Sequence, residues 1–187
     1  MSPRIGWRKV ARATDTRSFY ACLLPPRTLS ADHNYLLFFP EPDHEREEAY
    51  ILGCMCSLPF DWHARLWVEA NFTAHVVQPF PIPAVGRNNA LRRRVEEIAG
   101  TLASVDDRYE NWVNAVGVST SSCRSSEAKE VLLAELDAVV ARLYGLERSD
   151  VELLFRTFHR GWNYGPRLSA VLEYYQQLAP VVAEVGA

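Results

Sequence analysis

Basic side chains are concentrated near the N-terminus, where they alternate with apolar residues. Up to Phe39 the sequence carries six lysines and arginines against two aspartates, a net charge of +4, so the remainder carries −7 within the overall −3. A local band of cationic groups attracts a polyanion, of which the nucleic-acid backbone is the common case. Five of these basic residues surround the first expected hairpin: Arg4, Arg8, Lys9, Arg12 and Arg17.

Short polar side chains lie beside these basic groups. Thr14 and Asp15, together with Arg17, have the chemistry to reach the edges of bases, whereas the other basic residues suit phosphates. The alternative is structural, since alternating arginines also solvate the exposed face of an edge strand. The hairpin is therefore the first candidate site for DNA contact.

Two further basic positions have both a functional and a structural interpretation. Arg65 contacts DNA in the first; in the second, Asp61 caps a helix and pairs with Arg65 one turn later, while Trp62 is buried. The run Arg92 to Arg94 either contacts the DNA backbone or forms the solvent-exposed side of a helix. We predict the structural role at both places and keep Arg65 as a candidate DNA contact.

The usual motifs of catalysis and cofactor binding are absent from the sequence. It contains no GxGxxG and no GxxxxGK[ST] for nucleotide phosphates. Leu24-Pro25-Pro26-Arg27 has the prolines of the Asn-Pro-Pro-Tyr/Phe motif of amino-methyltransferases, but Leu24 cannot accept the hydrogen bond that the asparagine accepts. The cysteines and histidines lack the spacing of a metal site. We interpret His63, near Asp61, as a positional histidine, and expect no catalytic residue, metal ligand or cofactor in this chain.

Hydrophobic periodicity, prolines and capping residues predict the elements that would position these side chains. Strands are expected at 4–11, 18–24 and 35–39, and an extended, non-helical segment at 75–83 because of its prolines. Helices are expected at about 47–58, 60–70, 89–102, 126–144 and 149–155, with a last one from 166. Gly145 is the expected C-terminal cap of the fourth of these helices.

These elements predict the α+β class, with a small mixed sheet and two helices at the N-terminus followed by a C-terminal helical lobe. The expected division is an α/β lobe at 1–85 and a helical lobe at 86–187. An apolar fraction of 48% and a charged fraction of 23% are typical of globular proteins. The sequence has no apolar run of the roughly 18 residues that a membrane span needs, and no signal-peptide core, so a cytoplasmic protein without a membrane partner is expected.

Several segments of the sequence resemble those of a known protein family. They are residues 8–18 (RKVARATDTRS), 49–65 (AYILGCMCSLPFDWHAR), 80–83 (FPIP), 136–146 (LDAVVARLYGL) and 155–158 (FRTF). In this order they resemble the C-terminal part of class I N6-adenine DNA methyltransferases, especially type IIG restriction-modification enzymes and their phage-defence relatives. One departure is Cys56, where the family has asparagine before the serine.

The resemblance implies a function for each half of the chain. The N-terminal lobe would be a target-recognition region for double-stranded DNA, and the helical lobe would support it. The catalytic half, with its S-adenosylmethionine site, would belong to a preceding domain or to a separate methyltransferase subunit, so that this chain has no cofactor of its own. The alternative is a protein–protein docking module that assembles with a methyltransferase or nuclease subunit.

Overall fold

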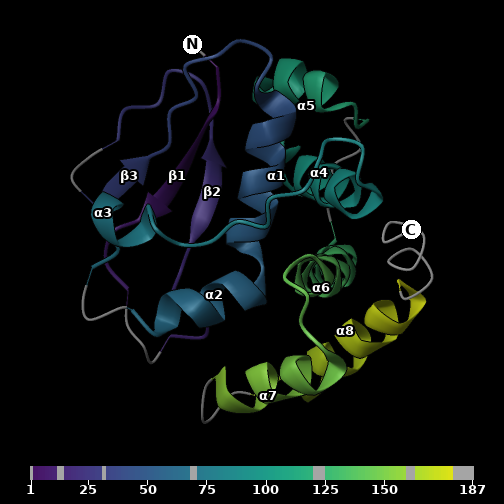
Figure 1. Ribbon diagram of the computed structural model, residues 1–187. Coiled ribbons are helices and arrows are strands. Elements are labelled where there is room, and N and C mark those ends of the chain that lie inside the picture. Colours follow the sequence, from purple (N-terminus) through teal and green to yellow (C-terminus); the bar gives the residue numbers. More distant parts are fainter. Residues whose placement is uncertain are drawn as a thin grey trace.

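The computed structural model describes residues 2–11, 15–30, 33–67, 71–119, 125–158 and 163–178 (Figure 1). Within these ranges a small sheet near the N-terminus is followed by a predominantly helical part, so the predicted α+β class is confirmed. The strands are β1 (Arg4–Arg8), β2 (Ala21–Leu24) and β3 (Asn34–Leu36). The helices are α1 (Glu45–Cys56), α2 (Leu58–Arg65), α3 (Ala74–Val77), α4 (Ala90–Ala103), the 3-10 turn η1 (Asp107–Tyr109), α5 (Glu110–Val116), α6 (Ser126–Leu143), α7 (Arg148–Phe158) and α8 (Gly165–Gln177).

The sheet has the strand order β2-β1-β3, and both of its pairings are antiparallel. The expectation of a mixed sheet was therefore wrong in this respect, because the chain reverses direction between β1 and β2, and β3 pairs with the other edge of β1 in the same direction as β2. Gly6 lies at the centre of the sheet, opposite Cys22 on one side and Leu36 on the other. A Cβ at Gly6 would come within 2.7 Å of Leu24 Cδ1, so glycine allows these side chains to meet over β1.

One face of the sheet is buried against α1, which lies between the sheet and the helices α4, α5 and α6 (Figure 1). Ile5 and Trp7 of β1 project into this core, where Trp7 stacks on Tyr35 with ring centroids 5.5 Å apart. The indole nitrogen of Trp7 donates to the Phe72 carbonyl at 2.9 Å. Strand alternation therefore directs the even-numbered residues of β1 to the opposite, outer face.

The outer edge of β2 is covered by two side chains. Tyr109 donates its hydroxyl proton to the Leu23 carbonyl at 2.9 Å, and the Cys56 thiol lies 3.5 Å from the Ala21 carbonyl. Both carbonyls point away from β1, since Arg8 N–H bonds Tyr20 O in the alternate register. The edge is thus hydrogen-bonded within the chain.

Helix α2 begins earlier and ends earlier than expected. Ser57, and not Asp61, caps it: Ser57 Oγ accepts the backbone N–H of Phe60 at 3.4 Å, and Pro59 fits the first turn because no hydrogen bond is required of its nitrogen there. Asp61 lies inside the helix and is fully buried. The prediction of Asp61 as the N-terminal cap and of a helix over 60–70 was therefore wrong, because Ser57 starts the helix one turn earlier.

The segment after Phe72 contains α3, so the prediction that residues 75–83 are wholly non-helical was also wrong. The four helical residues Ala74–Val77 precede Pro79, and even Gln78, directly before the proline, keeps right-handed helical angles (φ −54°, ψ −38°), so the disfavoured pre-proline conformation is adopted here. From Pro81 onward the chain is irregular, as the prolines require.

The long helices of the second half lie close to their expected positions. Gly145 follows α6 with a left-handed φ of 70°, as predicted. Asn89 caps α4 and Ser125 caps α6, each through its side chain. The short helix α5, which the sequence pattern did not reveal, places Trp112 against the core of the sheet.

The hydrophobic core does not divide at residue 85. Tyr50 and Cys54 of α1 share one buried cluster with Val95 of α4 and Val139 of α6. Residues on both sides of the expected boundary therefore pack in the same core.

Candidate nucleic-acid interface

The outer face of the sheet presents two arginines from one strand. Arg4 and Arg8 lie at the two ends of β1, separated by Gly6, and the alternation of the strand places both on the side away from α1. Each guanidinium group lies over an aromatic ring on that side. The face therefore has a cationic and aromatic pair at either end.

The first pair joins Arg4 to the segment after β3. The Cζ atom of Arg4 lies 5.5 Å from the centroid of the Phe38 ring, and Nη2 donates to the Thr28 carbonyl at 3.0 Å. Phe38 is 70% exposed, and Leu29, which follows Thr28, is 97% exposed. Arg4 thus lies over the exposed ring of Phe38 and bonds to the backbone of the residue that precedes the exposed Leu29.

The second pair joins Arg8 to the residue before β2. The Cζ atom of Arg8 lies 4.5 Å from the centroid of Tyr20, and Nη2 forms an exposed ion pair with Asp15 at 3.0 Å. An exposed ion pair of this kind contributes little to stability, about 0–1 kcal/mol. A phosphate group can therefore compete for Arg8 at small cost.

Arg17 does not belong to this face. Its Nε donates to Asp61 at 3.1 Å, and its Nη1 and Nη2 donate to the carbonyls of Cys56 and Ser57 at 2.7 and 3.1 Å. These contacts fasten the segment before β2 to the junction between α1 and α2. Arg17 has a structural role in this fold, and we exclude it from the proposed interface.

Asp61 is the buried partner of Arg17. Its other oxygen accepts the backbone N–H groups of Ser18 and Phe19 at 3.0 and 2.8 Å. Burial raises the pKa of Asp61, while Arg17 and the two backbone donors lower it in part. The expected pair of Asp61 with Arg65 was wrong, because Arg17, remote in sequence, reaches the carboxylate.

The remaining predicted site residues are dispersed. Lys9 is partly buried beside β1, and its backbone bonds to His33 and Phe72. Arg65 lies over the ring of Phe158 at 4.7 Å, between α2 and α7. Arg12 and Thr14 lie outside the described residues. The structure therefore brings Arg4, Arg8 and Asp15 into one region and places Arg65 elsewhere.

Arg92 was predicted on the solvent-exposed side of α4, and this was wrong. Its side chain is 7% exposed and pairs with Glu47 of α1 and Glu96 of α4. Arg94 pairs with Glu135 of α6 at 2.6 Å. The two arginines connect helices through ion pairs, and sequence periodicity could not show that a carboxylate from another helix faces each of them.

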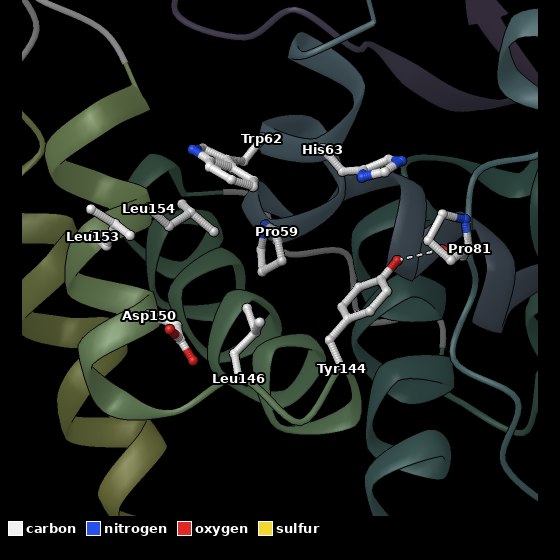
Figure 2. Close-up of a pocket in the computed structure, with 9 residues that line it drawn as sticks. All are labelled: Pro59, Trp62, His63, Pro81, Tyr144, Leu146, Asp150, Leu153 and Leu154. Atoms are coloured by element: carbon white, nitrogen blue, oxygen red, sulfur yellow. Dashed lines mark hydrogen bonds between the residues drawn. The ribbon is translucent and has the colours of Figure 1, made fainter.

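A second candidate site is a hollow of about 280 Å³ between α2, the end of α6 and the start of α7 (Figure 2). Pro59, Trp62 and Leu154 form much of its apolar wall, and Asp150 and His63 lie on different sides of it. The hollow has no serine, threonine, cysteine or lysine among its described lining residues, and thus no nucleophile beside a base.

The polar groups of the hollow are mostly engaged. Trp62 Nε1 donates to Thr157 at 3.1 Å, and the Tyr144 hydroxyl donates to the Pro81 carbonyl at 2.7 Å. Burial lowers the pKa of His63, which favours its neutral form. An apolar hollow with few polar groups suits binding better than acid–base catalysis.

Comparisons with protein-family models, with curated proteins and with solved structures found no match for this chain. Within the described ranges, no helix combines the length and the apolar character needed to cross a membrane. Among the same residues there is no group of three or more histidine, cysteine and acidic side chains placed to hold a metal ion.

The sequence pattern missed the aromatic members of the interface. Tyr20 directly precedes β2 and Phe38 follows β3 by two residues, and neither belongs to a recognisable sequence motif. Continued alternation beyond Leu36 was the only available signal for Phe38, since residues 34, 36 and 38 fall on one face of an extended chain.

Proposed function

We propose that this chain is the DNA-binding, target-recognition region of an adenine-specific DNA methyltransferase or restriction-modification enzyme. Duplex DNA lies against the outer face of the sheet. Catalysis and S-adenosylmethionine binding are performed by a methyltransferase domain or subunit outside this chain. The observation that carries the proposal is the pair of arginines on one face of β1, each held over an aromatic ring.

The spacing of the two arginines supports binding to a duplex. Their Cα atoms are four residues apart in a strand, which corresponds to about 13 Å. The major groove of B-form DNA is about 12 Å wide, so two side chains at this spacing can reach phosphates on opposite sides of it. Stacking on a ring keeps each guanidinium plane oriented without removing all of its donors.

The charge around the face supports a polyanionic partner. From Ser2 to Pro40 the sequence has six basic residues, among them Arg4, Arg8 and Arg27, against the two carboxylates Asp15 and Asp32. Arg27 is exposed and follows β2. Phosphate contacts therefore meet little like-charge repulsion here.

A second candidate function is docking onto a methyltransferase or nuclease subunit. The hollow in Figure 2 favours it, because its wall is largely apolar; in addition, Leu66 and Trp67, which follow α2, are 65% and 61% exposed. Apolar surface of this kind marks protein contacts more often than DNA contacts. Docking through this hollow and DNA binding through the sheet are compatible.

The test compares Arg4→Gln/Arg8→Gln with the unchanged chain by fluorescence anisotropy on a labelled 30-base-pair duplex at several salt concentrations. We expect binding that weakens steeply with salt, and a double variant whose log–log salt slope is smaller by about 1.8, or 0.9 for each phosphate that is no longer neutralised. Affinity at low salt should fall about tenfold or more, since neither glutamine can form a charge-assisted hydrogen bond to phosphate.

The matched control is Arg148→Gln on α7. Arg148 is 50% exposed and forms one ion pair with Glu152, much as Arg8 is 45% exposed and pairs with Asp15. Binding should be unchanged in this variant. An equal decrease in the control, or no salt-dependent binding at all, would contradict the proposal, and salt-insensitive assembly with a catalytic subunit would favour docking instead.

A further inference from the structure

The two most exposed large apolar side chains of the described residues lie at the same end of the proposed interface. Leu29 is 97% exposed and Phe38 is 70% exposed. Arg4 connects the two segments, because it bonds to the carbonyl of Thr28 and lies over the ring of Phe38. An isolated exposed apolar residue needs no explanation, but two beside a fixed cation on a basic face are an unusual combination.

The two ends of the face differ in the aromatic surface that they offer. At the Arg8 end, the guanidinium lies 4.5 Å above Tyr20, whose side chain is only 36% exposed. At the Arg4 end, the guanidinium lies farther from the ring of Phe38, at 5.5 Å, and most of that ring is exposed. The Arg8 end is suited to holding a phosphate, whereas the Arg4 end also offers apolar surface for contact with a base.

We propose that Phe38 and Leu29 form a wedge that unstacks a base step of the bound duplex, while Arg4 holds the adjacent phosphate. This inference rests on the proposed function and specifies how the DNA is bound. Apolar side chains inserted between base steps unstack and bend DNA, and every base offers a face on which an aromatic ring can stack. A wedge must project from the protein without losing its support. Phe38 is supported by its packing against Arg4, and the backbone beside Leu29 is held by the hydrogen bond from Arg4 to the Thr28 carbonyl.

The test uses the full chain and a series of duplexes that carry 2-aminopurine at successive positions, because its fluorescence rises when the base is unstacked. We expect the unchanged chain to raise the fluorescence about twofold or more at one position or step. Phe38→Ala/Leu29→Ala should abolish this rise but reduce affinity, measured by anisotropy, by no more than about tenfold, since the phosphate contacts remain.

Tyr20→Ala is the matched control, since it removes an aromatic ring from the opposite end of the same face. The rise in fluorescence should survive in this variant at saturating protein. Thermal unfolding should show that the wedge variant remains folded, because Phe38 and Leu29 are exposed.

The outcomes separate the two proposals. Salt-dependent binding without a rise at any position, or a rise that persists in Phe38→Ala/Leu29→Ala, overturns the wedge and leaves DNA binding intact. Absence of DNA binding overturns both. Disappearance of the rise in Tyr20→Ala as well as in the wedge variant shows that unstacking depends on the whole face, and also overturns the assignment to Phe38 and Leu29.

Discussion

Arginines in this protein have different roles because they meet different carboxylates. Arg8 meets the exposed Asp15, whereas Arg17 meets the buried Asp61 together with two backbone carbonyls. Ion pairs at exposed positions contribute about 0–1 kcal/mol, while removing one partner of a buried pair costs about 3–5 kcal/mol. The residue type alone therefore predicts the charge of an arginine. Whether the arginine is available to bind DNA or stabilises the fold depends on the carboxylate that it meets.

Glu48 is a buried carboxyl group that accepts hydrogen bonds from neutral donors. Its oxygens accept the backbone N–H of Ile5 at 3.2 Å and the indole N–H of Trp112 at 2.7 Å. Burial raises its pKa above the usual 4.5; these two donors and His44 lower it in part, and Glu45 raises it further. The folded state thus binds this proton more tightly than the unfolded state does.

The sign of the pH effect follows from that difference. The contribution of the raised pKa of Glu48 to stability is fully present below pH 4.5 and is lost as the pH rises through the folded-state pKa. We expect the stability of the unchanged chain, relative to Glu48→Gln, to decline from about pH 4.5 upward. Urea unfolding of both proteins between pH 4 and 8 measures this, and a constant difference across the range would refute it.

Helices α1 and α4 approach closely at a glycine. A Cβ on Gly53 would collide with Cγ1 of Val95 and would lie 3.4 Å from the Cβ of Ala99. The same two helices are also joined by ion pairs, between Arg92 of α4 and Glu47 of α1 and between Arg46 of α1 and Glu96 of α4. The distance between α1 and α4 is therefore set by the absence of a Cβ at Gly53 in one place and by ion pairs in another.

Gly53→Ala tests the close approach. Alanine in a helix interior is favoured over glycine by about 1 kcal/mol. Overpacking costs about 1–3 kcal/mol, and more where a branched side chain such as Val95 has little space to move. We expect net destabilisation in chemical denaturation. Gly86→Ala is the control, because nothing lies within 4 Å of the Cβ that it would add, and unchanged or increased stability of Gly53→Ala would show that the helices separate freely.

Elements with strong local signals could be predicted from the sequence, and short elements could not. The amphipathic pattern predicted α4 and α6, and Gly145 predicted the end of α6, since periodicity and capping are local requirements. Helices α3 and α5 have four and seven residues, too few for periodicity to be evident. Their formation depends on packing against distant segments.

At the scale of the whole molecule, the shared core argues against two lobes that fold separately. Trp112 of α5 donates to Glu48 and packs with the residues of the sheet, while α4 and α6 bury Tyr50 and Cys54 of α1. A fragment of residues 1–85 would expose these apolar surfaces to water. Each Å² of apolar area exposed costs about 25 cal/mol, and a small domain is stable by only about 5–15 kcal/mol, so the loss of this packing weakens the fragment.

We therefore expect the fragment 1–85 to lack cooperative thermal unfolding, although it contains the whole sheet. Circular dichroism and calorimetry of the fragment and of the full chain provide the comparison. The full chain is the reference for folding, and a sharp, reversible transition of the fragment alone would show that the division at residue 85 is physical.

The candidate site was predictable only in part for the same reason. Strand alternation placed Arg4 and Arg8 on one face, since that depends on the period of a strand alone. Arg17 bonds to Asp61, 44 residues away, and is therefore absent from the interface, while Phe38 lies beside Arg4. Both contacts depend on tertiary packing. A single sequence carries no direct record of such contacts.

The side chains that cover β2 have a consequence for association between copies of the chain. An uncovered edge strand offers free carbonyls on which a further strand can assemble, and this is a common route to aggregation. Because Tyr109 and Cys56 already occupy the Leu23 and Ala21 carbonyls, an incoming strand would have to displace both. The sheet is therefore protected from growing sideways along β2.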